Sequence, residues 1–582
     1  MPFAPRTMVQ RDRHESTGNA SLLVVVNGSG SYTDTSIVDV TVLVALQHFK
    51  FPYRIHDLAT GPLTSDLLAE CAAVVLAQAR LGDALSLEET DLVASAVEES
   101  GVGLVNFDGD LRLYQPPLLR LFGLEVDPIP MASDLLRIHT DEHFITRTQR
   151  QGSLVRLNRP VTFAQIKRVG RNVAELAQAA LGKDQLIFSR HNVPGTAYEP
   201  DQFPAVLAAT AGRGRAVQFA CSPRIWHREF LGHGMGLDAL FWRAIVWVAR
   251  KPFAALMMPP YVSVRVDDGS GRHDFGYVDV LNRHGHHPLI SCLLDSIPDE
   301  VVPFMQAKHA SGEADWDAHA FSYYDLIPFD FGIGERSDAD LRARFERIDA
   351  WYAQREIQPP ATAYFHWGEI GIRALPHLKS RGRTYLYATY DIGQLKWERL
   401  FPGWWPYGLN SLFYDYLPDD PDMYNVGAVL PRHLVEPDVL TGCTTWAGDN
   451  PTNDMDKASD RAAEAVRLAL DSGFYAEITT HEQKFGVLTL EEIDRWLSLI
   501  DTKTEPYDIR KVGHEHALSY TRARDESWIS TASTTAGRSL ELELDGASEM
   551  ALEVGRFDDE DEDVALRWET VPSFRGPTTA DC

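Results

Sequence analysis

The chain has 582 residues, a formal net charge of −28 and a hydrophobic content of 44%. So acidic a protein is a poor candidate for binding nucleic acid or anionic membranes, because both kinds of binding depend on Lys and Arg side chains. The five cysteines are widely spaced and form no paired motif, which argues against a disulfide scaffold and a zinc-finger pattern.

The N-terminal segment is polar and charged, and we expect a disordered tail over 1–21. It lacks the apolar stretch of a secretory signal, and no run of about 18 apolar residues occurs later in the chain. We therefore expect a cytoplasmic protein; secretion would require a signal that has been removed from this sequence. The sequence leaves open whether copies of the chain form a homo-oligomer.

The next region, 22–255, alternates between strand and helix patterns. Strands are expected at 22–28, 53–58, 72–78, 102–109, 186–190 and 215–220, and helices at 38–49, 86–101 and 237–251. This alternation is typical of an α/β domain built on a doubly wound parallel sheet.

A second β/α series fills 256–504. Strands are expected at 262–269, 288–294, 361–367, 384–390 and 474–481, and helices at 277–285, 340–356 and 488–501. The simplest arrangement is a distorted (β/α) barrel, in which chemistry takes place at the C-terminal ends of the strands. Short strand patterns after this region predict a small β extension and a tail over 505–582.

Charged and titratable residues stand at several of these strand ends. Asp267 and Asp268 end one strand, while His366 and His481 end two others. Two adjacent buried carboxylates are costly unless a cation, a shared proton or water accompanies them. The strand ends therefore predict a site, although Asp267 and Asp268 could merely cap a turn, and the histidines could be structural.

The stretch 264–295, VRVDDGSGRHDFGYVDVLNRHGHHPLISCLLD, resembles the opening of NodB-homology polysaccharide deacetylases. In both, a strand ends in Asp-Asp-Gly and is followed by a helix, a turn with His and Gly, and a second strand. The region before it, with 223–253, is similar to larger deacetylases that carry a class I glutamine-amidotransferase-like domain. The fungal galactosaminogalactan deacetylase type is one such protein.

The resemblance implies roles for particular residues. Asp267 would be the general base, Asp268 a metal ligand and His481 the general acid. His319 fits the first of two family histidines, but Tyr323 stands where the second is expected, so we expect His366 to complete the ligand set. The implied cofactor is a divalent metal, Zn²⁺ with Co²⁺ or Ni²⁺ as alternatives.

The implied activity is hydrolysis of a C–N bond, with an N-acetylated amino sugar in a polysaccharide, oligosaccharide or glycoconjugate as the substrate. Aromatic residues are expected to bind it, although loop packing would also explain most of them: Tyr323, Trp367, Trp404, Trp405 and Tyr407. Three alternatives stay open: a cytoplasmic small-molecule amidohydrolase, a catalytically silent carbohydrate-binding or assembly protein, and a glycoside hydrolase that uses Asp267 with a second carboxylate.

The amidotransferase-like domain is expected to be an accessory scaffold. Glutamine amidotransferases place a nucleophilic Cys on a tight turn from strand to helix. The corresponding turn is expected at 105–111, which contains no Cys, and Cys71 and Cys221 stand elsewhere. The sequence therefore predicts no glutaminase activity.

Overall fold

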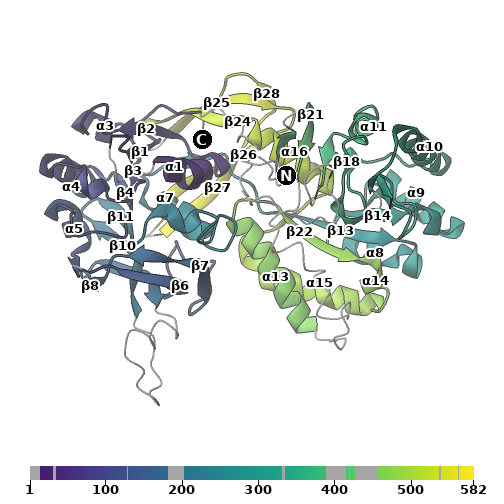
Figure 1. Cartoon of the computed structure of the whole chain (residues 1–582), viewed down its shortest axis with the longest axis horizontal. Helices are drawn as coiled ribbons and strands as arrows, with labels where there is room; N and C mark the ends of the chain where they lie inside the picture. The colour runs from purple at the N-terminus through teal and green to yellow at the C-terminus, as the bar shows by residue number, and fades with distance from the viewer. Residues whose placement is uncertain are drawn as a thin grey trace, which may run out of the picture. The chain divides into compact units, whose positions relative to one another are not determined.

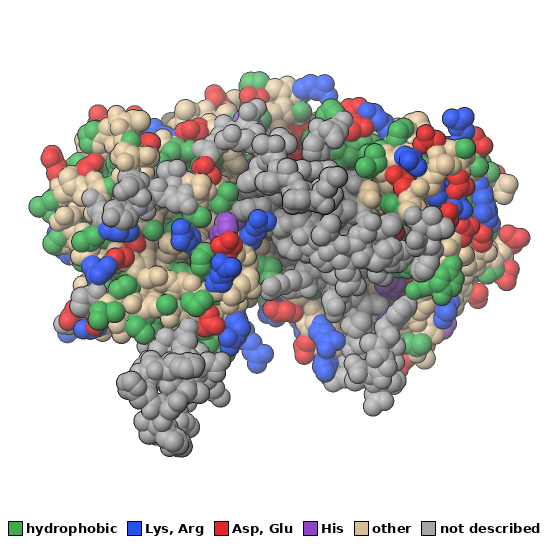
Figure 2. All heavy atoms as spheres, in the orientation of Figure 1, with side chains coloured by type: hydrophobic (Ala, Val, Ile, Leu, Met, Phe, Trp, Pro, Cys, Tyr) green, Lys and Arg blue, Asp and Glu red, His purple; other side chains and the backbone are tan. Residues whose placement is uncertain are grey.

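A computed structural model shows how these patterns fold. It describes residues 14–29, 35–127, 129–180, 202–330, 334–388, 393, 414–417, 420–426, 455–535, 539–560 and 563–581. The chain divides into two compact units (Figure 1), a central unit that contains Met258–Arg522 and a terminal unit made of Asp12–Met257 and Ala523–Cys582. On the face drawn in Figure 2, the described acidic and basic side chains are interspersed.

The terminal unit contains a nine-stranded sheet of order β2-β1-β3-β4-β11-β10-β9-β6-β7. Its parallel part consists of β1 (Leu22–Val26), β2 (Tyr53–Asp57), β3 (Ala73–Leu76), β4 (Gly103–Phe107) and β11 (Gly214–Phe219). Its antiparallel part adds β6 (Met131–Ile138), β7 (Leu154–Phe163), β9 (Val173–Ala180) and β10 (Gln202–Ala211). The short β5 (Glu125–Val126) and β8 (Ile166–Arg168) pair separately.

The expected parallel βα units are therefore present, whereas the antiparallel half was not expected. In β7, exposed and buried residues largely alternate, which is typical of an antiparallel strand with one solvated face. The strand expected at 186–190 lies outside the described residues. The doubly wound arrangement as a whole stays a prediction.

The helices of the terminal unit follow the parallel strands. They are α1 (Thr35–Val38), continued by a π-helix (Asp39–Leu43) and α2 (Val44–His48), then α3 (Ser65–Ala69), α4 (Leu87–Ser100), α5 (Pro116–Phe122) and α7 (Asp238–Val248). The ends of α4 are fixed by its sequence. Ser86 and Glu89 form a capping box at its start, and Gly101, with a φ of +71°, ends it in the left-handed conformation.

The C-terminal strands belong to the terminal unit instead of extending the central one. They are β24 (Ser527–Thr535), β25 (Ser539–Ser548), β26 (Leu552–Glu560), β27 (Asp563–Val571), β28 (Phe574–Arg575) and β29 (Thr578–Asp581). β26 pairs with β27 and with β12 (Phe253–Ala255), while β25 pairs with β24, β28 and β29. The boundary expected at residue 505 thus lies near 522.

The described part of the expected tail over 1–21 is ordered. Ser16 Oγ donates to the carbonyl of Ile529 at 2.6 Å, and Ala20 N donates to the carbonyl of Ala532 at 3.0 Å. Ser16 and Ala20 are buried. This segment is ordered because it satisfies backbone groups beside β24, which the sequence pattern of the segment alone does not reveal.

The first part of the expected β extension is helical. The segment around 514–525 forms α16 (His514–Asp525). Its buried residues, among them His514, Ala517, Leu518, Thr521 and Arg524, recur every three or four positions. That spacing gives one buried face on a helix and would scatter the same side chains over both faces of a strand.

The central unit contains a parallel sheet of order β15-β14-β13-β22, with β23 also paired to β13. The strands are β13 (Tyr261–Gly269), β14 (Pro288–Leu293), β15 (Asp315–Ala320), β22 (Ala476–His481) and β23 (Arg510–Lys511). A second sheet is formed by β18 (Thr362–Ala363), β19 (Tyr385–Leu386), β20 (Asp415–Leu417) and β21 (Asp420–Asn425), and β16 (Phe329–Asp330) pairs with β17 (Gly334–Glu335). Closure into a barrel stays a prediction.

Helices connect these parallel strands. They are α8 (Gly276–Arg283), α9 (Val302–Ala310), α10 (Asp338–Arg355), α11 (Leu375–Lys379), α13 (Met455–Asp471), α14 (Glu482–Phe485) and α15 (Leu490–Thr504). All nine residues of β13 are buried, so its end brings polar residues into the interior. Among the described helices of both units, none is long and apolar enough to cross a membrane.

Candidate functional site

The two adjacent aspartates lie at a β-bulge. The pairing of β13 with β14 shifts register between Val266 and Gly269, and Asp268 has a φ of +58°. In a regular strand, neighbouring side chains point to opposite faces. A bulge changes the direction of a side chain and is common beside functional sites. Here Asp267 contacts Arg265, two residues earlier, whereas Asp268 lies among histidines.

Asp268, His319 and His366 come together as a buried group. Asp268 Oδ1 lies 3.2 Å from His366 Nδ1 and 3.6 Å from His319 Nε2, and the two imidazole nitrogens are 2.9 Å apart. All three residues are at most 4% exposed, and their candidate ligand atoms lie within 4.8 Å of one another. A carboxylate with two imidazoles around one point is a donor set suited to a divalent transition metal.

Hydrogen bonds and charge favour the ligand forms of these side chains. His319 Nδ1 lies 3.3 Å from the carbonyl oxygen of Tyr364, which favours a proton on Nδ1 and a lone pair on Nε2. Burial lowers the pKa of His319 to about 4, so the imidazole is neutral at neutral pH. Burial opposes ionisation of Asp268, but His366, His319 and His481 hold the pKa of that carboxyl below its usual value.

The buried polar atoms also fit a cation. Asp268 Oδ1 is buried and receives no well-aligned hydrogen bond, despite its short distance to His366. A buried carboxylate oxygen in that situation is costly unless a positive charge compensates it. The three side chains thus fit a metal ion in their ligand types, in the closeness of their donor atoms and in the unsatisfied Oδ1 of Asp268.

The short helix α14, which follows β22, supports Asp268 from the other side. Gln483 Nε2 donates to Asp268 Oδ2 at 2.9 Å, which leaves Oδ1 directed to the histidines. Its neighbour Glu482, which is fully buried, accepts hydrogen bonds from three backbone N–H groups and two hydroxyls: Ser270 N, Gly271 N, Arg272 N, Ser270 Oγ and Tyr277 Oη. These contacts fix the loop that follows the Asp pair. Neither residue was identified from the sequence, although both directly follow His481.

Asp267 is held by a buried ion-pair network. Arg265 contacts Asp267 and donates through Nε to Glu477 Oε1 at 3.0 Å. Its guanidinium also lies over the ring of Tyr364, 3.8 Å from the ring centre. Arg265 and Glu477 were not identified from the sequence. A signal was present, since Arg265 and Asp267 are two residues apart on one strand and must share a face.

The other predicted site residues lie around this group. His481 is the register partner of Asp267 across β13 and β22. The Tyr323 ring lies 5.1 Å from the His366 ring, and burial together with Asp268 raises the pKa of its phenol, which stays protonated at neutral pH. The Trp367 ring lies 4.9 Å from the same histidine. Trp404, Trp405 and Tyr407 lie outside the described residues.

No known protein-family profile and no curated protein matches this sequence. Solved structures do match, at low similarity. A cytoplasmic protein, STM1381, from Salmonella typhimurium LT2 is 14% identical, with 38% of this chain and 97% of that chain covered and a TM-score of 0.26. A family 4 carbohydrate esterase from Streptomyces lividans is 10% identical over 43% of this chain and 91% of its own, with a TM-score of 0.26.

A chitin deacetylase from the fungus Colletotrichum lindemuthianum is similar to the same degree. It is 10% identical, with 45% of this chain and 88% of that chain covered and a TM-score of 0.27. The amidotransferase-like domain and the galactosaminogalactan type stay predictions. Neither activity nor substrate follows for this chain from similarity at this level.

Proposed function

We propose that the central unit is a metal-dependent hydrolase of C–N bonds that removes the acetyl group from an N-acetylated amino sugar. The observation that carries this proposal is the buried group of Asp268, His319 and His366, with Asp267 and His481 beside it. Three protein ligands leave positions open for water and substrate, which is the pattern of catalytic and not of structural metal sites.

The two aspartates would act differently because their surroundings differ. Asp268, His319 and His366 would hold the metal, which when bound polarises a carbonyl and lowers the pKa of water. The carboxylate of Asp267 forms an ion pair with Arg265 instead. Its carboxylate would accept the proton of the attacking water as general base, with Arg265 fixing its orientation.

His481 would complete the reaction from the neighbouring strand. Its position beside Asp267 across β13 and β22 puts an imidazole at the same sheet edge as the base. It would donate a proton to the amine nitrogen as the C–N bond breaks. Tyr323, which keeps its phenolic proton, would donate a hydrogen bond toward substrate from the side of His366.

The test measures acetate release by protein purified without a metal-affinity tag and then loaded with Zn²⁺, Co²⁺ or Ni²⁺. The substrates are N-acetylglucosamine oligomers, a polysaccharide that contains N-acetylgalactosamine, and small N-acyl amides. Acetate from the sugars supports the proposal, and hydrolysis of the small amides alone would favour the amidohydrolase alternative. Absence of acetate with every metal and every substrate would refute the proposed deacetylase function.

Asp267→Asn is the matching variant. It keeps the shape of the side chain and should lower kcat by about 10²-fold or more, while metal content stays unchanged, because removal of a general base costs that much. Asp299→Asn is its control, since Asp299 has a fully exposed side chain. Full activity in Asp267→Asn would remove Asp267 as the base.

A further inference from the structure

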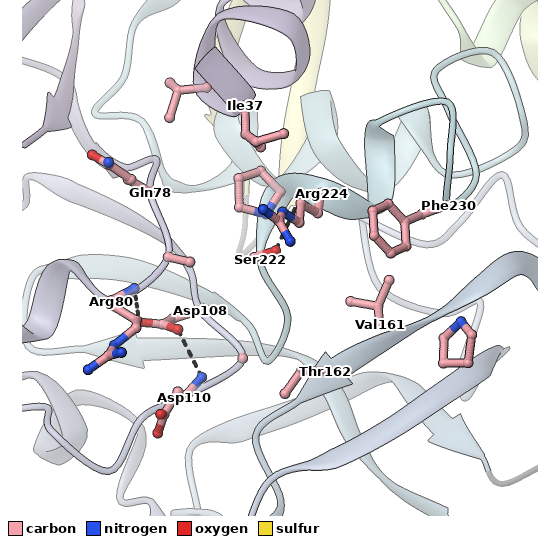
Figure 3. Close-up of a pocket in the computed structure, with 15 residues that line it drawn as sticks. Ile37, Gln78, Arg80, Asp108, Asp110, Val161, Thr162, Ser222, Arg224 and Phe230 are labelled. Carbon is pink, nitrogen blue, oxygen red and sulfur yellow. Dashed lines mark hydrogen bonds between the residues drawn. The ribbon is translucent and has the colours of Figure 1, made fainter. Parts of the chain in front are cut away.

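A cavity of about 440 Å³ lies within the terminal unit (Figure 3). Its lining comes from the loops that follow β3, β4 and β11, together with residues of α1 and β7. Ligands of parallel α/β sheets bind outside the carboxyl ends of the strands. The volume is also within the range of about 300–1,000 Å³ that is typical of small-molecule sites.

The polar wall of this cavity is built around Asp108, which is 1% exposed. Its two carboxylate oxygens accept hydrogen bonds from Arg80 N and Asp110 N, both at 2.8 Å. Arg80 has a φ of +66°, a strained conformation for a residue other than glycine. A Cβ at Gly109 would lie 2.4 Å from the carbonyl oxygen of Thr162. The strain and the tight packing hold Asp108 in one orientation.

The formal charges around the cavity balance. Asp108 and Asp110 are acidic, and Arg80 and Arg224 are basic. Arg112 donates through Nε to Asp110 Oδ1 at 2.7 Å, so that carboxylate already has a partner. Burial raises the pKa of Asp108 to about 7, against the effect of its backbone N–H partners and of the Tyr114 hydroxyl. Near neutral pH its carboxyl can thus both accept and donate hydrogen bonds, as hydroxyl groups of a ligand require.

The opposite wall is apolar. Figure 3 shows the ring of Phe230 with Val161 on one side of the cavity, Asp108 on the other, and Arg224 between them. Arg224 makes no ion pair with the described acidic residues. A ligand that matches these walls carries hydroxyl groups along its edge for Asp108 and Arg224, an apolar face for the aromatic ring, and no net charge.

We propose that this cavity binds a single neutral sugar ring. Asp108 would accept hydrogen bonds from adjacent hydroxyls, Arg224 would donate to ring or hydroxyl oxygens, and Phe230 would cover the face that carries C–H groups. This proposal goes beyond the proposed function and does not depend on it, because its residues all belong to the terminal unit.

The experiment is saturation-transfer NMR on the full chain in a His319→Ala background, which disables the candidate metal site of the central unit. The probes are N-acetylglucosamine, N-acetylgalactosamine, glucose and galactose, with glucuronate and inorganic phosphate as charged probes. A neutral sugar should show transfer and saturate in the millimolar range. Loss of acetate release in the metal-loaded wild type would leave this result unchanged, so the two proposals fail separately.

Three variants locate the binding. Asp108→Asn, Arg224→Ala and Phe230→Ala should each lower the affinity by about tenfold or more, since hydrogen bonds to charged groups and aromatic contacts have about that weight. Arg150→Ala, at an exposed position of the same unit, is the control and should bind normally. Three results would overturn the proposal. They are sugar binding that survives all three variants, saturation transfer to the charged probes alone, and no transfer to any sugar in a folded protein.

Discussion

The Nε2 atom of His319 and the Nδ1 atom of His366 lie 2.9 Å apart, although 47 residues separate them along the chain. His319 is the last residue but one of β15, and His366 follows β18 in the second sheet of the central unit. Asp268, from a third strand, directs one oxygen to both nitrogens. Three strand ends thus meet at one point, where a metal ion would neutralise the carboxylate and use both lone pairs.

Removal of a ligand should abolish metal binding. His319→Ala deletes one imidazole of a site with three protein ligands, and we expect stoichiometric Zn²⁺ in the wild type but none in the variant. Elemental analysis after gel filtration measures this. His139→Ala is the control, because His139 is exposed in the terminal unit. Equal metal content in wild type and His319→Ala would contradict the assignment of the site.

Gln483 should tune the affinity of this site without being a ligand. Its amide fixes Oδ2 of Asp268, and loss of such a supporting hydrogen bond weakens metal binding by about 10–100-fold. Competition between the protein and a chromophoric chelator measures the affinity of Gln483→Ala. Gln354→Ala, on the exposed side of α10, should bind like the wild type. Gln483→Asn keeps an amide and should recover part of the lost metal affinity. Unchanged metal affinity in Gln483→Ala would show that Asp268 needs no such support.

Glu477 should stabilise the central unit against unfolding at neutral pH, and less so at acidic pH. Burial opposes its ionisation, but Arg265 and His514 hold the pKa of Glu477 well below its usual value. Because the folded pKa is depressed, this stability is present above the unfolded pKa of about 4.3 and is lost as pH falls from there toward the folded pKa. Glu477→Gln breaks a buried pair and should lower the free energy of unfolding by about 3 kcal/mol at neutral pH.

The pH series distinguishes this electrostatic effect from a packing defect. Urea unfolding of the metal-free protein, followed by circular dichroism, should show that the difference between wild type and Glu477→Gln narrows at acidic pH. Glu346→Gln, at an exposed position, should match the wild type throughout. A difference that is the same at acidic and neutral pH would assign the effect to packing.

The described cysteines should be unreactive in the folded protein. Burial raises the pKa of Cys71 and of Cys221 to about 12, and it also raises the pKa of Cys292. The thiolate is the reactive form, so iodoacetamide should label these three residues only after denaturation. Peptide mass spectrometry measures the labelling. Rapid labelling of native Cys71 or Cys221, or ammonia release from glutamine, would contradict the scaffold interpretation of the terminal unit.

The candidate site could be predicted in part because strand ends are visible in sequence. Asp267, Asp268 and His481 stand at the ends of segments with a strand pattern, so their position at one sheet edge followed from parallel pairing. His319 and His366 were selected with help from a family resemblance. Gln483 was missed because a supporting hydrogen bond leaves no periodic pattern in the chain. Arg265 was missed although its two-residue spacing from Asp267 on one strand was a usable signal.

The fold shows the same difference between features that depend on neighbouring residues and features that depend on distant ones. Helix caps such as Ser86 with Glu89 depend on neighbouring residues and could be predicted locally. The pairing of residues 16–20 with β24 depends on contacts across more than five hundred residues. The antiparallel half of the terminal sheet likewise depends on which strands find each other.

The sequence by itself determined the strand–helix alternation of the two α/β regions and the residue kinds able to bind a metal, because local propensity and hydrophobic period depend on near neighbours. It did not determine the helical state of His514–Asp525, for which strands were expected. Only the tertiary structure decided that Asp267 and Asp268 have different partners. A one-residue bulge and a left-handed backbone at Asp268 direct its carboxylate to His319 and His366, whereas Asp267 remains with Arg265. That geometry arises from pairing between strands, and pairing is a property of the folded chain.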